Sequence, residues 1–139
     1  DHAPGMRACL VRLLLEACAV VRDARTGLAE SERALEMGGA ASVWEAEAHR
    51  LRAEFLAMLG SPAQDIEAEL KHALVVARRQ GAKMFELRTA VSLLRHRLER
   101  GDGPGTTKAR DLLAAILDGF TEGLDTPDLR EAATLLAQT

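Results

Sequence analysis

Four glycines divide this chain at nearly even intervals, and each ends a segment that has the apolar period of an amphipathic helix. They are Gly38, Gly60, Gly81 and Gly101. The segments between them align on corresponding positions: Leu15, Ala53 and Ser92 in the first helix of each pair, and Ala34, Ala73 and Ile116 in the second. A helix pair that recurs about every 40 residues predicts a solenoid, because one pair cannot bury its own apolar face and must stack on the next.

The helical periodicity and the residues that end each segment predict seven helices. They predict no strand, since no stretch keeps the two-residue period of a strand for long. The expected helices cover residues 6–21, 26–37, 42–59, 64–80, 82–100, 106–120 and 126–138. The first six form three hairpins, at about 6–39, 42–81 and 82–121, and the seventh caps the last hairpin. We therefore expect an all-α fold, a right-handed α-solenoid that forms a single domain over residues 1–139.

Local signals set three of the boundaries. Ser42, followed by Glu45 three positions later, is a capping box and predicts a helix that starts at Ser42. Thr126 and Pro127 predict the N-cap and the first helical position of the last helix. The stretch GDGPG at 101–105 predicts a loop, where insertions cost little free energy.

Composition narrows the class of protein. Hydrophobic residues make up 47% and charged residues 28% of the 139, which suits a folded globular chain, and an aromatic content of 3% favours helix over strand. The net charge is −3, so the chain lacks the excess of basic residues that nucleic-acid-binding proteins use to neutralise backbone phosphates. We therefore expect no direct nucleic-acid binding. No apolar run approaches the ~18 residues of a membrane span, and no signal-peptide pattern is present. We expect a cytoplasmic protein without a membrane partner, and the start at Asp1 predicts a fragment of a longer chain.

Two cysteines fall on the first expected helix. A rise of about 1.5 Å per residue separates the Cα atoms of Cys9 and Cys18 by roughly 13 Å, which is too far for a disulfide. We expect both to be small buried residues in a reducing compartment.

The repeats resemble tetratricopeptide repeats, which place small residues at both helix crossings and a bulky residue near the middle of the second helix. Leu70 and Leu113 occupy the bulky position, and Ser31 departs from it in the first pair. Cys18 and Leu56 stand where that family commonly has tyrosine, so the repeats are divergent.

A closer likeness covers residues 44–136. The strings WEAEAHRLRAEFL, ARRQGAKMFELRTAVSLLR and FTEGLDTPDLREAATLL are similar to the C-terminal repeat region of large bacterial signalling and transcription-regulatory proteins. Those proteins join a nucleotide-cyclase-like or DNA-binding output domain to a P-loop ATPase domain, followed by tetratricopeptide repeats. The resemblance implies a non-catalytic protein-interaction or sensor module, with the ATPase and output chemistry upstream. A small-molecule effector-binding domain and a structural dimerisation arm remain as alternatives.

No sequence motif indicates catalysis, a cofactor or a metal, and we expect no enzyme. The stretch GDGPGTTK at 101–108 follows a helix and lacks a lysine directly after its last glycine, so it predicts a helix connector rather than a P-loop. The histidines, His2, His49, His72 and His96, lack the close spacing of a helical zinc site. We expect ordinary interhelical or surface histidines, with His49 and His72 able to face one another across the second hairpin.

The carboxylates on the third helix are expected to form exposed pairs. Glu47 and Glu54 lie three and four positions from Arg50, and such pairs contribute a few tenths of a kcal/mol. General acid–base chemistry would need two carboxylates in a concave, desolvated site, and nothing in the sequence supplies one.

A candidate binding groove follows from the resemblance, because the first helix of each tetratricopeptide pair lines the concave face of the solenoid. The outward positions of these helices are Arg12, Glu16, Glu47, Arg50, Glu54, Glu86, Thr89 and His96. The set mixes both charges and has no aromatic clamp, which suits a polar or charged peptide or protein, including upstream domains of the parent. A solvated helix face fits equally well, a homodimer is left open, and Trp44 is expected to pack in the core rather than anchor a partner.

Overall fold

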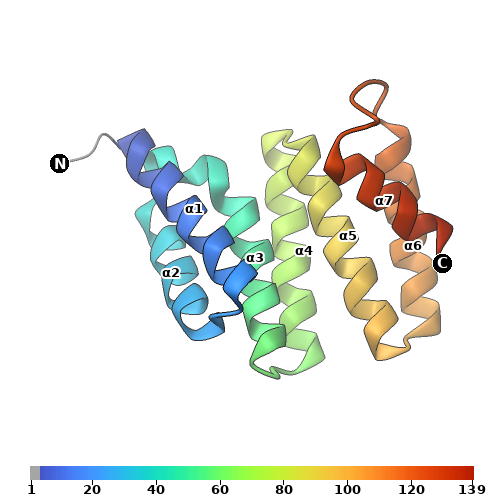
Figure 1. Ribbon diagram of the computed structural model, residues 1–139, viewed down its shortest axis with the longest axis horizontal. Helices are drawn as coiled ribbons and strands as arrows, with labels where there is room; N and C mark the ends of the chain where they lie inside the picture. The colour runs from blue at the N-terminus through green and yellow to red at the C-terminus, as the bar shows by residue number, and fades with distance from the viewer. Residues whose placement is uncertain (1–3) are drawn as a thin grey trace. The chain divides into compact units, whose positions relative to one another are not determined.

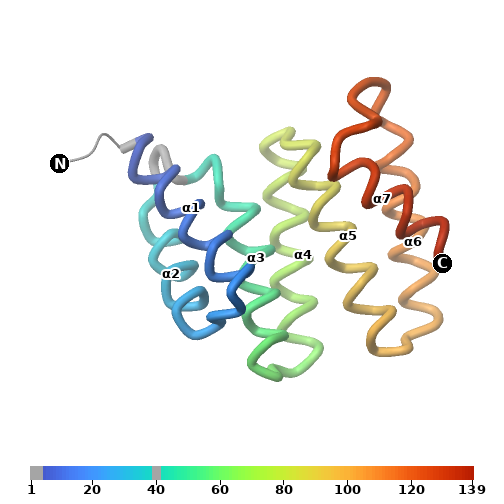
Figure 2. The backbone as a smooth tube through the Cα atoms, viewed as in Figure 1, coloured from blue at the N-terminus to red at the C-terminus, as the bar shows by residue number. Residues whose placement is uncertain are grey.

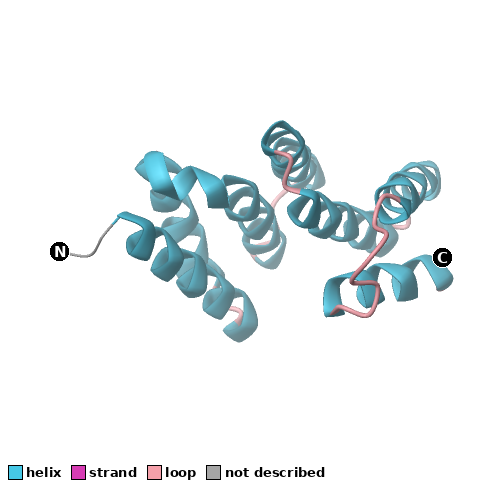
Figure 3. Ribbon diagram, turned by 90° about the horizontal axis from the view of Figure 1, so that it is seen from above, coloured by secondary structure: helices cyan, strands magenta, loops and turns pink. Residues whose placement is uncertain are grey.

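The computed structural model describes residues 4–139, except for the side chains of Pro4 and residues 39–41. This part of the chain is 84% helix and has no strand, which confirms the all-α prediction and the seven helices (Figure 3). A short 3₁₀ helix, η1, lies between the second and third. The elements are α1 (Pro4–Val21), α2 (Ala24–Met37), η1 (Gly39–Trp44), α3 (Glu45–Met58), α4 (Ala63–Gln80), α5 (Lys83–Arg100), α6 (Gly103–Asp118) and α7 (Pro127–Ala137).

The helices form two compact units, and the first runs to Gln80. In this unit α1 packs on α2, η1 and α3, while α3 packs between α2 and α4 (Figure 1). Its core joins α1, α2 and α3 through buried side chains of each, namely Leu15, Cys18, Ala24, Ala48, Leu51 and Phe55. Burial of these apolar side chains is the main favourable contribution to folding of the unit.

The closest approach in this core is between Phe55 and the backbone of α2. The Phe55 ring is fully buried, and a Cβ added at Gly27 would lie 2.4 Å from ring atom Cζ. Gly27 is therefore required by packing, although glycine within a helix costs about 1 kcal/mol relative to alanine. The ring fills the space that a side chain at Gly27 would take.

The second hairpin of this unit, α3 with α4, uses small residues where the sequence predicts them. Ala53 on α3 and Ala73 on α4 are both buried, and Leu70, the predicted bulky residue of α4, is buried with them. The turn after α4 passes through Gly81 at a φ of +66°, a left-handed conformation that favours glycine.

The second unit begins at Gly81 and contains α5, α6 and α7. Helices α5 and α6 run side by side, and α7 packs against both (Figure 2). Leu87 and Leu94 of α5, Leu113 of α6 and Ala132 of α7 are buried completely. Arg88 of α5 donates hydrogen bonds of 2.9 and 3.1 Å to Asp128 Oδ2 of α7.

Two predicted helix starts are wrong. Ser42 lies within η1, and α3 begins only at Glu45 with Trp44 at the N-cap and no side-chain cap, so the capping box does not form. Helix α6 begins inside the predicted loop, at Gly103, because Asp102 accepts a hydrogen bond from Gly105 N at 3.0 Å and Pro104 suits the first turn. Gly103 and Gly105 therefore lie in the first turn of a capped helix rather than in a loop.

Two predictions about single residues are also corrected. Cys18 is buried as expected, but Cys9 is exposed, because α1 turns the two thiols to different faces. Thr126 does occupy the N-cap of α7 with an extended backbone, yet its side chain makes no cap hydrogen bond.

None of the described helices is long and apolar enough to cross a membrane.

Candidate functional site

The eight candidate groove residues are divided between the units. Arg12 and Glu16 lie on α1 and Glu47, Arg50 and Glu54 on α3, all in the first unit. Glu86, Thr89 and His96 lie on α5, in the second.

Arg12 connects α1 to the start of α3. Its guanidinium lies over the Trp44 ring, 4.6 Å from the ring centroid, and forms an ion pair with Glu16 one turn along α1. A cation over the face of tryptophan contributes roughly 0.5–1 kcal/mol at such partly exposed positions. Trp44 is therefore half-buried beneath an arginine rather than enclosed in the core.

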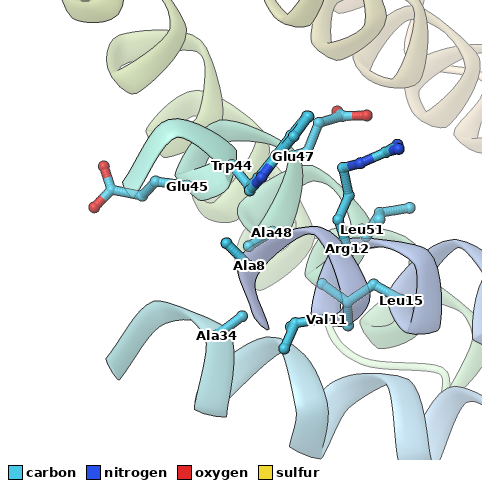
Figure 4. Close-up of a pocket in the computed structure, with 10 residues that line it drawn as sticks. All are labelled: Ala8, Val11, Arg12, Leu15, Ala34, Trp44, Glu45, Glu47, Ala48 and Leu51. Carbon is cyan, nitrogen blue, oxygen red and sulfur yellow. The ribbon is translucent and has the colours of Figure 1, made fainter. Parts of the chain in front are cut away.

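A small cavity lies beneath this pair, between α1, α2, η1 and α3. Its lining joins the Arg12 and Trp44 side chains to Glu47 and to a floor of small and aliphatic residues, namely Ala8, Val11, Leu15, Ala34, Ala48 and Leu51. Figure 4 shows Glu45, which also contributes to the rim, with its carboxylate turned away from the others. The volume of about 20 Å³ is enough for about one water molecule and excludes a metabolite.

Glu47 and Arg50 form the buried part of the charged surface. Glu47 is only 2% exposed, and Arg50 meets it with two hydrogen bonds, 2.6 Å from Nε and 3.1 Å from Nη2. Arg50 Nη1 donates a further bond of 2.9 Å to Glu54, whose side chain is 36% exposed. The expectation of exposed pairs is wrong for Glu47, because α3 is covered on several sides. Its two-bond pair with Arg50 offsets part of the cost of desolvating the carboxylate.

The candidates on α5 are less suited to binding. Thr89 is buried and its hydroxyl donates to the Phe85 carbonyl at 2.8 Å, so this side chain does not point outward as predicted. Glu86 and His96 are half-buried. A threonine that bonds the carbonyl one turn earlier is satisfied within its own helix.

A second polar cluster in the first unit links three helices. His49 of α3 stacks on His72 of α4, with ring centroids 3.9 Å apart, so these histidines do face one another across the hairpin. His49 Nδ1 also lies 2.8 Å from Glu69 Oε2. Arg52 bonds Glu69 as well and reaches Glu32 of α2 at 3.3 Å.

The sequence did not reveal the Glu69–Arg52–Glu32 contacts, because their partners lie 17 and 20 positions apart, beyond any helical spacing. The described residues contain no group of three or more histidine, cysteine, aspartate or glutamate side chains placed to hold a metal ion. His2 lies outside the described residues. We therefore assign this cluster to the packing of α2, α3 and α4.

Comparison with known proteins adds no relative: no protein-family model matches the chain, and neither the curated proteins nor the solved structures give a match.

Proposed function

We propose that this chain is a non-catalytic protein-interaction or sensor module of a larger bacterial signalling or transcription-regulatory protein, built as a right-handed tetratricopeptide-like solenoid. Three helical pairs, α1 with α2, α3 with α4 and α5 with α6, support this reading, as do Ala53 and Ala73 buried in the second pair. The FTEGLDTPDLREAATLL string at the end of the chain supports the family.

The observation that carries the proposal is the joined charged surface of α1 and α3. Arg12 and Glu47 line the same cavity, Glu16 is paired to Arg12, and Arg50 bridges Glu47 to Glu54. Five residues predicted for one groove therefore lie in one connected set, which we call the α1–α3 surface. Its arginines are held in fixed orientations by carboxylates and by Trp44, and a preorganised surface loses less entropy on binding.

A peptide or protein segment fits this surface better than a small molecule does. The cavity in this surface holds about one water molecule, so a metabolite would have no enclosed site within the α1–α3 surface. The partly exposed groups of this surface carry both charges, with Glu16 and Glu54 more exposed than Arg12 and Arg50, and a polar segment with both charges would complement them. Binding there would change the populations of conformations available to the parent protein, with the free energy set by the difference in affinity.

Selection of peptides tests this assignment. A library of linear peptides displayed on phage is panned against the chain, and selected peptides are measured by fluorescence polarisation. We expect peptides rich in charged residues, and the double variant Glu16→Lys and Glu54→Lys should weaken them at least about 10-fold, since it reverses two exposed charges of the surface. Both residues are partly exposed and leave the buried Glu47–Arg50 pair intact.

A matched control carries the same charge change elsewhere. Glu36→Lys on α2 and Glu99→Lys on α5 reverse two exposed charges outside the α1–α3 surface and should leave peptide affinity within about twofold. Equal losses in both double variants would show non-specific attraction to negative charge and contradict the groove. A failure to select any peptide, with a hit from a thermal-shift screen of metabolites, would favour the small-molecule alternative.

A further inference from the structure

Helix α1 leaves its most apolar side chains in solvent. Six large aliphatic residues of this helix are exposed by 41% to 82%: Met6, Leu10, Leu13, Leu14, Val20 and Val21. From residue 6 to residue 21, the exposed positions include one charged residue, Arg7, while Arg12 and Glu16 beside them are partly exposed. On α4, the exposed positions are instead mostly polar or charged, with Val75 as the large aliphatic exception. A helix that packs one face inward normally turns a polar face to water, so this pattern needs an explanation.

The spacing of these residues is that of a helix-pairing seam. Met6, Leu10, Leu13, Ala17 and Val20 follow one another at steps of four and three, and Leu14 and Val21 flank the seam on one side. Alternating steps of three and four are the a and d positions of a heptad, which pack knobs into holes against another helix at a crossing angle of about 20°. The opposite face of α1 carries Ala8, Leu15 and Cys18 into the core of the first unit.

The exposed area is sufficient for a two-fold interface. The six side chains leave on the order of 600 Å² open, the size of the largest patches on ordinary monomers. Two copies packed through this seam would bury about twice that, at the lower end of the ~1,200–2,000 Å² of specific interfaces. A two-fold contact also needs no second surface, because the same patch serves both partners.

We propose that the α1 seam, defined as Met6, Leu10, Leu13, Leu14, Ala17, Val20 and Val21, binds the α1 seam of a second copy of this chain. The uncharged character of the seam allows it to meet its own copy without repulsion between like charges. Arg7 is the exposed cation within residues 6–21 and Arg22 follows the seam at its end, and two cations give little attraction for an anionic lipid surface. The proposal is independent of the α1–α3 surface, because Arg12 and Glu16 lie beside the seam and not in it.

The test is the molecular mass in solution. Sedimentation equilibrium and light scattering between about 1 and 100 µM should give a species of twice the 15.0 kDa chain mass that dissociates on dilution. Leu13→Glu places a charge at the centre of the seam in both copies and should raise the dimer dissociation constant at least about 100-fold. Val75→Glu places the same charge at an exposed apolar position of α4 and should leave the dimer dissociation constant within about twofold.

A second readout separates loss of dimer from loss of fold. Cys9 is exposed beside the seam, so a bis-maleimide should cross-link the unmodified chain into a dimer. Leu13→Glu keeps Cys9 and should lose the cross-link while its circular dichroism stays helical. A chain that is monomeric up to 100 µM, or one in which both glutamate variants dissociate the dimer equally, would overturn the proposal. Sedimentation of a monomeric chain with phosphatidylserine vesicles would overturn it in favour of a membrane.

Discussion

Helices α1 and α3 each pack against the helix that follows in the chain, yet their apolar side chains differ in how far they are buried. On α3, Leu51 and Phe55 are buried and even the carboxylate of Glu47 is removed from water. On α1, Leu10 and Leu13 are about half exposed. The difference follows from neighbours, since α3 packs against α1, α2 and α4, whereas within the first unit α1 packs against α2, η1 and α3 on one side only. Burial here is set by whether the neighbouring elements surround a helix or cover one side of it, and not by the helix's apolar content.

The strongest test of this comparison truncates one side chain on each helix. Phe55→Ala should lower the free energy of unfolding by about 3–5 kcal/mol, because it removes a fully buried ring and leaves a cavity against Gly27. Val20→Ala on α1 should change it by less than about 0.5 kcal/mol, because the side chain is 82% exposed. Urea denaturation followed by circular dichroism measures both.

Both truncations should be made in the Leu13→Glu background, so that self-association of the α1 seam adds nothing to the measured stability. Comparable losses for Val20→Ala and Phe55→Ala in that background would show that α1 is covered by another part of the chain. The contrast between the helices would then be wrong.

A smaller effect tests the buried charge of α3. Arg50→Met removes a partner of Glu47 and should cost about 2–3 kcal/mol, since an almost fully buried carboxylate loses two hydrogen bonds. Glu54→Gln, at the exposed end of the same arginine, should cost less than about 1 kcal/mol. If the two losses were equal, Glu47 would be solvated and α3 would resemble an ordinary surface helix.

The sequence predicted the positions of the helices far better than the burial of their side chains. Periodicity and glycine stops located all seven α-helices, because both signals are local and depend on neighbouring residues along one chain. The helix start predicted at Ser42 was wrong because residues up to Trp44 form η1 and α3 begins after them. The start of α6 was predicted too late, because the N-cap Asp102 lies within a glycine-rich stretch that is typical of a loop.

The candidate site shows the same division. The one-turn spacings of Arg50 with Glu47 and Glu54 predicted real ion pairs. The pair between Arg12 and Glu16 has the same kind of spacing but was not predicted. Their depth was not predictable, because burial of Glu47 and Thr89 depends on helices distant in sequence. Gly27 was likewise unnoticed, since only the approach of Phe55 gives it a role.

The smallest expected effect is a difference in reactivity between the two thiols of α1, which lie on opposite faces of the helix. Cys9 is exposed, whereas Cys18 is buried, and burial, followed by the negative charges of Asp23 and Glu30, raises the pKa of the Cys18 thiol. A raised pKa lowers the thiolate fraction at pH 8, and access requires local opening, so Cys18 should react with Ellman's reagent at least about 10-fold more slowly than Cys9. Cys9→Ser and Cys18→Ala identify the two phases. Equal rates for the two thiols would mean that α1 does not hold Cys18 against the core.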